Sequence, residues 1–152
     1  MAAHIIDAVG VWFYCPVTER YLYLLRSDRR NPDVWGLPGG KLLGGESLLE
    51  AMDRECREEL GSVPPYRGLA PLEKFTSPDR HFHYHTFFAV VDQEFLPTLN
   101  HEHLGYAWIN ADRWPQPMHP GLWSLINLDE IHTKLMILRG RDHTSHCETK
   151  SR

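Results

Sequence analysis

The sequence predicts one domain of mixed α and β structure, either α+β or a layered α/β/α arrangement with a mixed sheet between helices. The apolar pattern along the chain runs strand-rich, helix, strand-rich, helix, which is typical of such folds. The chain has 152 residues, enough for one compact domain, and its 42% hydrophobic and 24% charged content is ordinary for a globular protein. We therefore expect one domain over residues 1–138, followed by a polar, flexible C-terminal tail over residues 139–152.

Strands are expected where short runs of β-branched, aromatic and other apolar residues are bounded by turn residues. Such runs lie at residues 8–14, 21–26, 69–76, 83–91 and 106–110. Trp35, Leu37 and Pro38 form a short extended piece, because proline excludes helix there. A second helix is expected over residues 121–131, with Leu122, Leu125 and Ile126 directed inward.

The clearest helix is predicted over residues 47–60. An apolar stripe recurs at steps of three and four residues and is formed by Leu48, Leu49, Met52, Cys56 and Leu60. Ser47 with Glu50 three residues later is typical of an N-terminal capping box, and Gly61 is a suitable C-terminal residue.

This helix also carries a dense group of carboxylates. Glu55, Glu58 and Glu59 share one face, with Arg54 beside them at the spacing of an ion pair with Glu58. Carboxylates packed this closely raise one another's pKa, and a hard divalent cation such as Mg²⁺ removes that cost. A loop with four glycines, GGKLLGGE, precedes the helix and leaves room for backbone carbonyls and phosphates. The alternative is that these charged residues only form a solvated helix face. The glycine loop at a fixed distance from the carboxylates argues against that alternative.

Composition excludes several classes of protein. The formal net charge of -4 argues against a protein that coats nucleic acid, although cations could still recruit a nucleotide. Cys15, Cys56 and Cys147 form no CxxC pair, which favours free thiols in a reducing compartment. The first ten residues do not resemble a signal peptide, and no apolar stretch approaches the roughly 18 residues of a membrane span. We expect a cytoplasmic protein without a membrane partner.

The segment from Gly40 to Ser62 resembles the Nudix signature, Gx5Ex7REUxEExGU, in which U is aliphatic. Its fixed positions fall in register at Gly40, Glu46, Arg54, Glu55, Glu58, Glu59 and Gly61. Cys56 occupies the first aliphatic position and is a tolerable small apolar substitute. Ser62 occupies the second and departs from the pattern, which weakens a packing contact. The resemblance extends to WGLPGGK before the signature and to NHEHLGYAW after it, so it covers most of residues 8–128.

The resemblance implies an α/β/α sandwich that hydrolyses a nucleoside diphosphate linked to another group, with Mg²⁺ as cofactor and Mn²⁺ as a substitute. Metal ligands would be Glu58, Glu59 and the Gly39 carbonyl, with Glu55 as a ligand or the general base. Arg54 would orient the carboxylates, and Gly40 and Glu46 would support the loop. Glu102 is the candidate for a late glutamate that acts as ligand or base, with Glu94 as the alternative.

The substrate is left open among several classes. Pro78, sixteen residues after Ser62, resembles the pattern of ADP-ribose pyrophosphatases and slightly favours ADP-ribose or a nucleotide sugar. A nucleoside triphosphate pyrophosphatase is the main alternative, followed by decapping of nucleotide-capped RNA and by a non-catalytic nucleotide sensor. Retention of the complete carboxylate set argues against the sensor. The family's frequent dimerisation leaves a homodimer open.

Four residues are tentative substrate contacts. Trp35 and Tyr84 could stack on a base, since aromatic stacking contributes about 1–3 kcal/mol per base. Pro78 and His81 would line the same region. His81, His83 and His85 alternate on one strand face and could contact phosphate or bind a transition metal, although a half-exposed strand face is the more common explanation of such a pattern. His101 and His103 flank Glu102 and either shape the pocket or belong to an ordinary surface.

Overall fold

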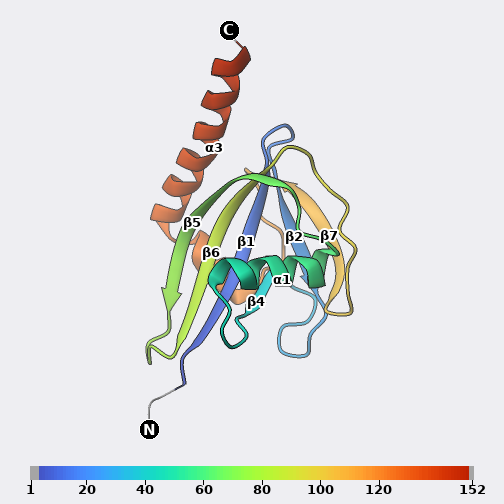
Figure 1. Cartoon of the computed structure of the whole chain (residues 1–152), viewed down its shortest axis with the longest axis vertical. Helices are drawn as coiled ribbons and strands as arrows, with labels where there is room; N and C mark the ends of the chain where they lie inside the picture. The colour runs from blue at the N-terminus through green and yellow to red at the C-terminus, as the bar shows by residue number, and fades with distance from the viewer. Residues whose placement is uncertain (1–3, 151–152) are drawn as a thin grey trace.

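The computed structural model describes residues 4–150, with side chains described for residues 4–140. A seven-stranded mixed sheet forms the centre of the molecule (Figure 1). The strands are β1 Ile6–Cys15, β2 Arg20–Arg26, β3 Trp35–Gly36, β4 Gly39–Lys41, β5 Tyr66–Thr76, β6 Phe82–Val91 and β7 His103–Asn110. The helices are α1 Leu48–Leu60, α2 Pro120–Ile126 and α3 Asp129–Lys150. All of the strands expected from the sequence are present.

Strand β1 changes its partner along its length. It pairs in parallel with β6 throughout, but it pairs with β2 only at Tyr14 and Cys15. Towards its beginning, Ala8 to Gly10 pair instead with β4. The main path of the sheet is β3-β2-β1-β6-β5, and β7 pairs with β2 away from this path. The sheet is therefore split between β4 on one side and the β2–β7 pair on the other.

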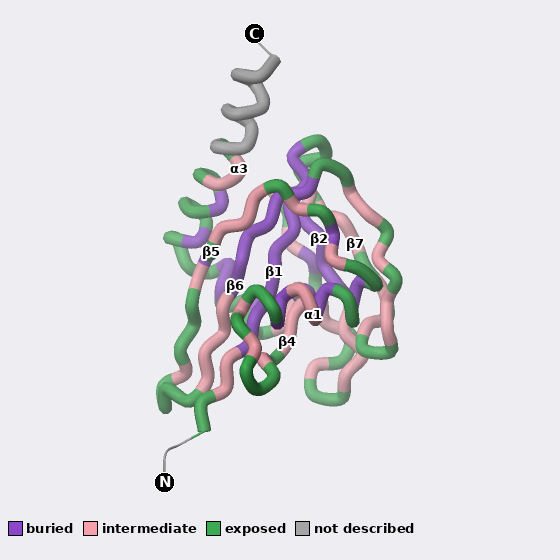
Figure 2. Tube along the Cα trace, in the orientation of Figure 1, coloured by how far each residue is buried: buried purple, intermediate pink, exposed green. Residues whose placement is uncertain are grey.

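The two faces of the sheet carry separate cores, which confirms the sandwich arrangement. Val9, Val11 and Phe13 of β1 pack towards the buried face of α1, which crosses the front of the sheet in Figure 1. The alternating residues Trp12 and Tyr14 pack on the opposite face, with the buried side chains of α2 and α3. Figure 2 shows the buried chain concentrated in β1, β2 and β6. This alternation follows from the two-residue period of a strand.

Helix α1 begins and ends as the sequence predicts, with one exception on its apolar stripe. The capping box between Ser47 and Glu50 is formed, and Gly61 adopts a left-handed conformation with φ 88°. Leu49, however, is 48% exposed, so its expected place in the core is wrong. Periodicity gives the direction of a side chain but not how far the sheet extends along the helix. The first turn of α1 is not covered on the Leu49 side.

The C-terminal region contains two helices where one was expected. Leu122, Leu125 and Ile126 of α2 are buried as predicted, but the helix ends at Asn127, and α3 then adds Ile131 and Leu135 to the core. The backbone of α3 runs through the segment expected as a flexible tail from residue 139. Side chains 141–150 and residues 151–152 lie outside the described residues, so its flexibility stays a prediction. Within the described part of the chain, no helix combines the length and apolar character needed to cross a membrane.

Candidate active site

Arg54 is the centre of the hydrogen-bond network on α1. Its guanidinium donates two bonds to Glu46, from Nε to Oε2 at 2.7 Å and from Nη2 to Oε1 at 3.0 Å. Nη1 also donates to Glu55 Oε1 at 2.9 Å and to Glu58 Oε2 at 3.2 Å. Since a guanidinium presents its donors in a fixed plane, this arrangement holds three carboxylates in set orientations.

The glycine loop is closed by the same network. Glu46 Oε1 accepts a bond from the Leu43 N–H at 2.7 Å, and Arg54 Nη2 donates to the Lys41 carbonyl at 2.9 Å. The hydrogen bonds from Arg54 lower the pKa of Glu46 below its usual range. The loop is thus tied to the middle of α1 by side-chain hydrogen bonds.

Glu59 lies deepest in the site. Its Oε2 accepts a hydrogen bond from the Gly39 N–H at 2.7 Å, and burial raises the pKa of Glu59 to about 9. Gly39 has φ 154°, and a Cβ there would overlap the Val9 carbonyl, so only glycine fits. The structure therefore shows Gly39 acting through its N–H, and a metal contact from its carbonyl stays a prediction.

Glu55 occupies an intermediate position between Arg54 and Glu59. Burial raises the pKa of Glu55, the hydrogen bond from Arg54 opposes this rise, and the charges of Glu58 and Glu102 add to it. A side chain at Gly40 would overlap the Glu55 carboxylate, because β4 passes directly against α1 at this point. Glu55 therefore has the raised pKa and the fixed position that a general base requires.

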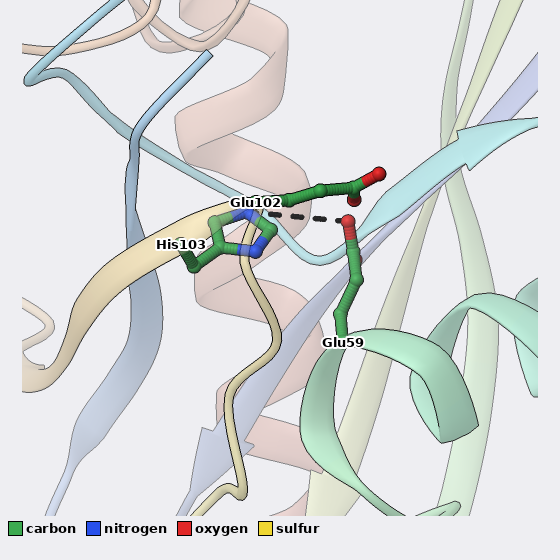
Figure 3. A group of neighbouring side chains, drawn as sticks. All are labelled: Glu59, Glu102 and His103. Carbon is green, nitrogen blue, oxygen red and sulfur yellow. Dashed lines mark ion pairs between the residues drawn. The ribbon is translucent and has the colours of Figure 1, made fainter.

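A second group of side chains comes from β7 and the residue before it. Ligand atoms of Glu59, Glu102 and His103 all lie within 4.8 Å of one another (Figure 3). The His103 side chain is only 6% exposed, and its Nε2 lies 4.0 Å from Glu59 Oε1. Burial, helped by the charge of Arg26, lowers the pKa of His103 to about 4, so its ring is uncharged at neutral pH.

These residues fit a divalent cation. Glu59 and Glu102 supply carboxylate oxygens, the donors that Mg²⁺ and Mn²⁺ prefer. Burial raises the pKa of Glu59 and Glu55 and so disfavours their ionised forms, an effect that a bound cation would oppose. His103 Nδ1 is buried without a hydrogen-bond partner among the described residues, while its Nε2 faces Glu59.

Glu102, and not Glu94, lies beside Glu59. Glu94 forms a two-bond ion pair with Arg20, at 2.5 Å and 2.7 Å, at the start of β2. Arg26 and His103 pair at the other end of the same strand, beside Glu102. The pairing of β2 with β7 therefore separates the two glutamates.

The tentative substrate residues divide into two groups. Tyr84 lies over Gly10, and burial with the charges of Glu59 and Glu55 raises the pKa of its hydroxyl to about 12. Trp35 is bonded through its backbone to Pro117 and His119, and its ring packs partly against the core. Tyr84 therefore lies near the carboxylates, whereas Trp35 packs with the core on the sheet face opposite α1.

Pro78 and His81 are not brought to the site. Both are exposed in the turn between β5 and β6, which Figure 1 shows near the N-terminus and away from β7. Their assignment as substrate contacts has no support from this arrangement. His83 and His85 contact Thr76 and Asp7 on neighbouring strands, each at 3.0 Å.

Two residues near the site gave little signal in the sequence. Arg26, at the end of β2, forms an ion pair with Asp28, and its charge contributes to the lowered pKa of both His103 and His119. His119 contacts Asn31 at 3.4 Å and accepts a bond from the Gly121 N–H at 3.0 Å. For Arg26, the sequence offered one signal, namely a single positive charge at the end of an otherwise apolar strand. Nothing in the pattern marked His119.

Comparison with known proteins identifies the family of this chain. Residues 5–128 match the family described as the NUDIX domain, so the chain belongs to the Nudix family. Together with its hydrolase relatives, this membership defines the chain as a hydrolase of the pyrophosphatase type.

Individual relatives show how far the likeness extends. The nucleoside triphosphatase NudI of Klebsiella pneumoniae subsp. pneumoniae is 33% identical over 113 residues, which are 64% of this chain and 80% of the relative. A NUDIX hydrolase structure from Nitrosomonas europaea has a TM-score of 0.61 and 26% identity, with 86% of this chain and 90% of the other covered. A bifunctional NMN adenylyltransferase/ADP ribose pyrophosphatase from Francisella tularensis has a TM-score of 0.57 and 23% identity, which shows the fold alone. The match covers 73% of this chain but only 35% of that longer protein.

Proposed function

We propose that the chain is a Mg²⁺-dependent pyrophosphohydrolase that cleaves the phosphoric anhydride of a nucleoside diphosphate linked to a second group. The observation that carries this proposal is the convergence of Glu59, Glu102 and His103 beside the Arg54 carboxylate network. A bound divalent cation would neutralise phosphate charge and activate the attacking water. Mn²⁺ would serve in place of Mg²⁺.

Each residue then has a defined task. Glu58, Glu59 and the Gly39 carbonyl would hold the cation, and Glu102 would complete the site as a ligand or a base. Glu55, whose raised pKa and central position suit proton transfer, would accept the proton of the attacking water. Arg54 would keep these carboxylates in place, while Glu46 and Gly40 would fix the loop against α1.

Two classes of substrate are the main candidates, and they differ in the group that is linked to the nucleoside diphosphate. The position of Pro78 in the sequence favoured ADP-ribose or a nucleotide sugar, but Pro78 lies in the exposed β5–β6 turn. The relative in Klebsiella pneumoniae is a nucleoside triphosphatase, which supports a nucleoside triphosphate as the alternative. Trp35 and Tyr84 would contact the nucleoside in either case.

The proposed setting is the cytoplasm, with free nucleotides rather than membranes as partners. Cys15 and Cys56 are buried free thiols, in agreement with a reducing compartment. RNA would be a substrate only as a nucleotide-capped end, because the net charge of -4 opposes binding along a nucleic-acid backbone. The homodimer stays a prediction.

The test is a Mg²⁺-dependent hydrolysis screen with ADP-ribose, nucleotide sugars, nucleoside triphosphates, dinucleoside polyphosphates and capped RNA, with products identified by mass. We expect turnover of at least one nucleotide, and loss of turnover in Glu58→Gln and Glu59→Gln with the circular dichroism spectrum retained. Full activity in both variants would contradict the assigned metal ligands. Binding of nucleotides without any turnover by the wild type would favour a sensor.

A further inference from the structure

We propose that His103 is a further protein ligand beside Glu59 and Glu102, and that its imidazole raises the affinity of this cation site for first-row transition ions, Mn²⁺ in particular, relative to Mg²⁺. The inference rests on the proposed function only for the presence of a cation at Glu59. It goes further by naming a nitrogen ligand and the metal preference that this ligand confers.

The backbone of His103 is held in place by strand pairing within the sheet. His103 is the first residue of β7 and pairs with Arg26 at the end of β2. From there its ring points towards Glu59 of α1, while Glu102 approaches from the preceding residue (Figure 3). Helix α1 and the start of β7 therefore direct their side chains to one point.

The distances match a shared ion better than a hydrogen bond. His103 Nε2 and Glu59 Oε1 are 4.0 Å apart, beyond hydrogen-bond range. Ligands at about 2.1 Å from one ion are separated by roughly 3 Å when adjacent and roughly 4 Å when opposite. The candidate donor atoms of all three residues lie within 4.8 Å of one another, so small side-chain adjustments would place them around one cation.

A packing role does not account for this imidazole. The His103 side chain is 6% exposed, and its Nδ1 has no hydrogen-bond partner among the described residues. An unsatisfied buried polar group costs about 1–3 kcal/mol, so packing alone is a poor explanation for an imidazole at this position. His101, two residues earlier, is exposed and provides a natural comparison.

The donor set has a consequence for metal choice. Mg²⁺ binds oxygen ligands and water almost exclusively, whereas imidazole suits the first-row transition metals. Affinity within that row rises from Mn²⁺ towards Cu²⁺, so availability in the cell decides which of these ions is bound. Mn²⁺ is the ion of this row that also accepts two carboxylates readily.

The direct test uses the wild-type protein loaded with one equivalent of Mn²⁺ and no nucleotide. Pulsed electron paramagnetic resonance should show coupling of the Mn²⁺ electron spin to an imidazole ¹⁴N nucleus. This signal should persist in His101→Gln and disappear in His103→Gln. Absence of nitrogen coupling in the wild type would overturn the proposal, whatever the folding of the variants.

Affinity gives the second readout. Mn²⁺ binding, measured by titration with Mg²⁺ as competitor, should show a Mn²⁺/Mg²⁺ preference that falls at least about tenfold in His103→Gln, the lower limit for residues that merely support metal ligands. The His101→Gln variant should keep the wild-type ratio. An unchanged ratio in a folded His103→Gln would refute the inference even if the enzyme hydrolyses nucleotides. Nitrogen coupling without any nucleotide turnover would instead refute the proposed function and leave the inference in place.

Discussion

At Glu59, the fold places a carboxyl group with 3% exposure next to a single backbone donor, the Gly39 N–H. Burial raises the pKa of Glu59 to about 9, while the same group in an unfolded chain has a pKa of about 4.3. In metal-free protein, the folded state thus keeps a proton that the unfolded state has lost across this pH window. The stability linked to Glu59 is therefore fully present below pH 4 and is lost as pH rises towards 9.

We expect Glu59→Gln to remove this pH dependence in metal-free protein. The free energy of unfolding of the wild type should decline relative to that of Glu59→Gln between pH 5.5 and 8.5, because glutamine has no proton to lose. Urea denaturation with a chelator present, at several pH values, measures the difference. Glu130→Gln, exposed on α3, should follow the wild-type slope, and parallel curves for wild type and Glu59→Gln would contradict the raised pKa.

Which site residues could be predicted depends on how locally they are held. Arg54, Glu55 and Glu58 belong to one helix, and helix geometry fixes their spacing in the sequence itself. His103 became part of the site only through the register that pairs it with Arg26. That register depends on contacts between strands far apart in the chain, which one sequence does not specify.

Among elements, the closest approach in the site is that of β4 to α1. Gly40 of β4 lies against the Glu55 carboxylate with no room for a side chain. Gly39, its neighbour, lies equally close to β1 at the Val9 carbonyl. This three-residue strand is therefore a spacer between β1 and α1, and its glycines set the distance between them.

We predict that Gly40→Ala lowers kcat by about 100-fold, the effect of a displacement near 1 Å at a catalytic group. The added methyl group would push Glu55 away from Arg54 without removing any charge. Steady-state kinetics on the substrate found in the screen, with thermal unfolding to monitor the fold, measures the effect. Gly44→Ala is the matched control, since a Cβ at Gly44 meets nothing within 4 Å. Equal kcat values in the two variants would contradict this role.

The elements themselves were predictable where the pattern and the local signals agree. Ser47, Glu50 and Gly61 define both ends of α1, and the apolar runs define the long strands. The break between α2 and α3 was not predicted, because the apolar spacing from Leu122 to Ile131 continues across Asn127. The backbone turns there while its side chains stay on one face of the core.

For the whole molecule, the order of the sheet was beyond prediction. Sequence periodicity identifies strands but not their partners, and β1 has three partners of two different orientations. The division into two cores followed once α1 and the α2–α3 pair occupied opposite faces. The sandwich was expected from the family resemblance, and the split beside β4 was not.

We propose that the folded domain ends before residue 141, close to the boundary at 138 expected from the sequence. A chain of residues 1–140 should retain turnover and its unfolding temperature within about 2 °C, because Ile131, Leu135 and Leu138 of α3 remain to pack on the core. A chain of residues 1–128, which lacks these side chains, is the control and should unfold at a much lower temperature. Loss of folding in the longer chain would show that the segment after residue 140 belongs to the domain.

The split sheet also has a consequence for folding kinetics. Glu59 is positioned by α1, which packs on β1, whereas Glu102 and His103 are positioned by β7, which joins through β2. Between β1 and β2 the connection is limited to the pairs at Tyr14 and Cys15. A refolding chain can therefore form either half first, but high-affinity cation binding requires both halves. The pairing of β2 with β7 is slow to form, because its residues are far apart in the sequence. In a stopped-flow experiment, Mn²⁺ uptake would mark the end of folding.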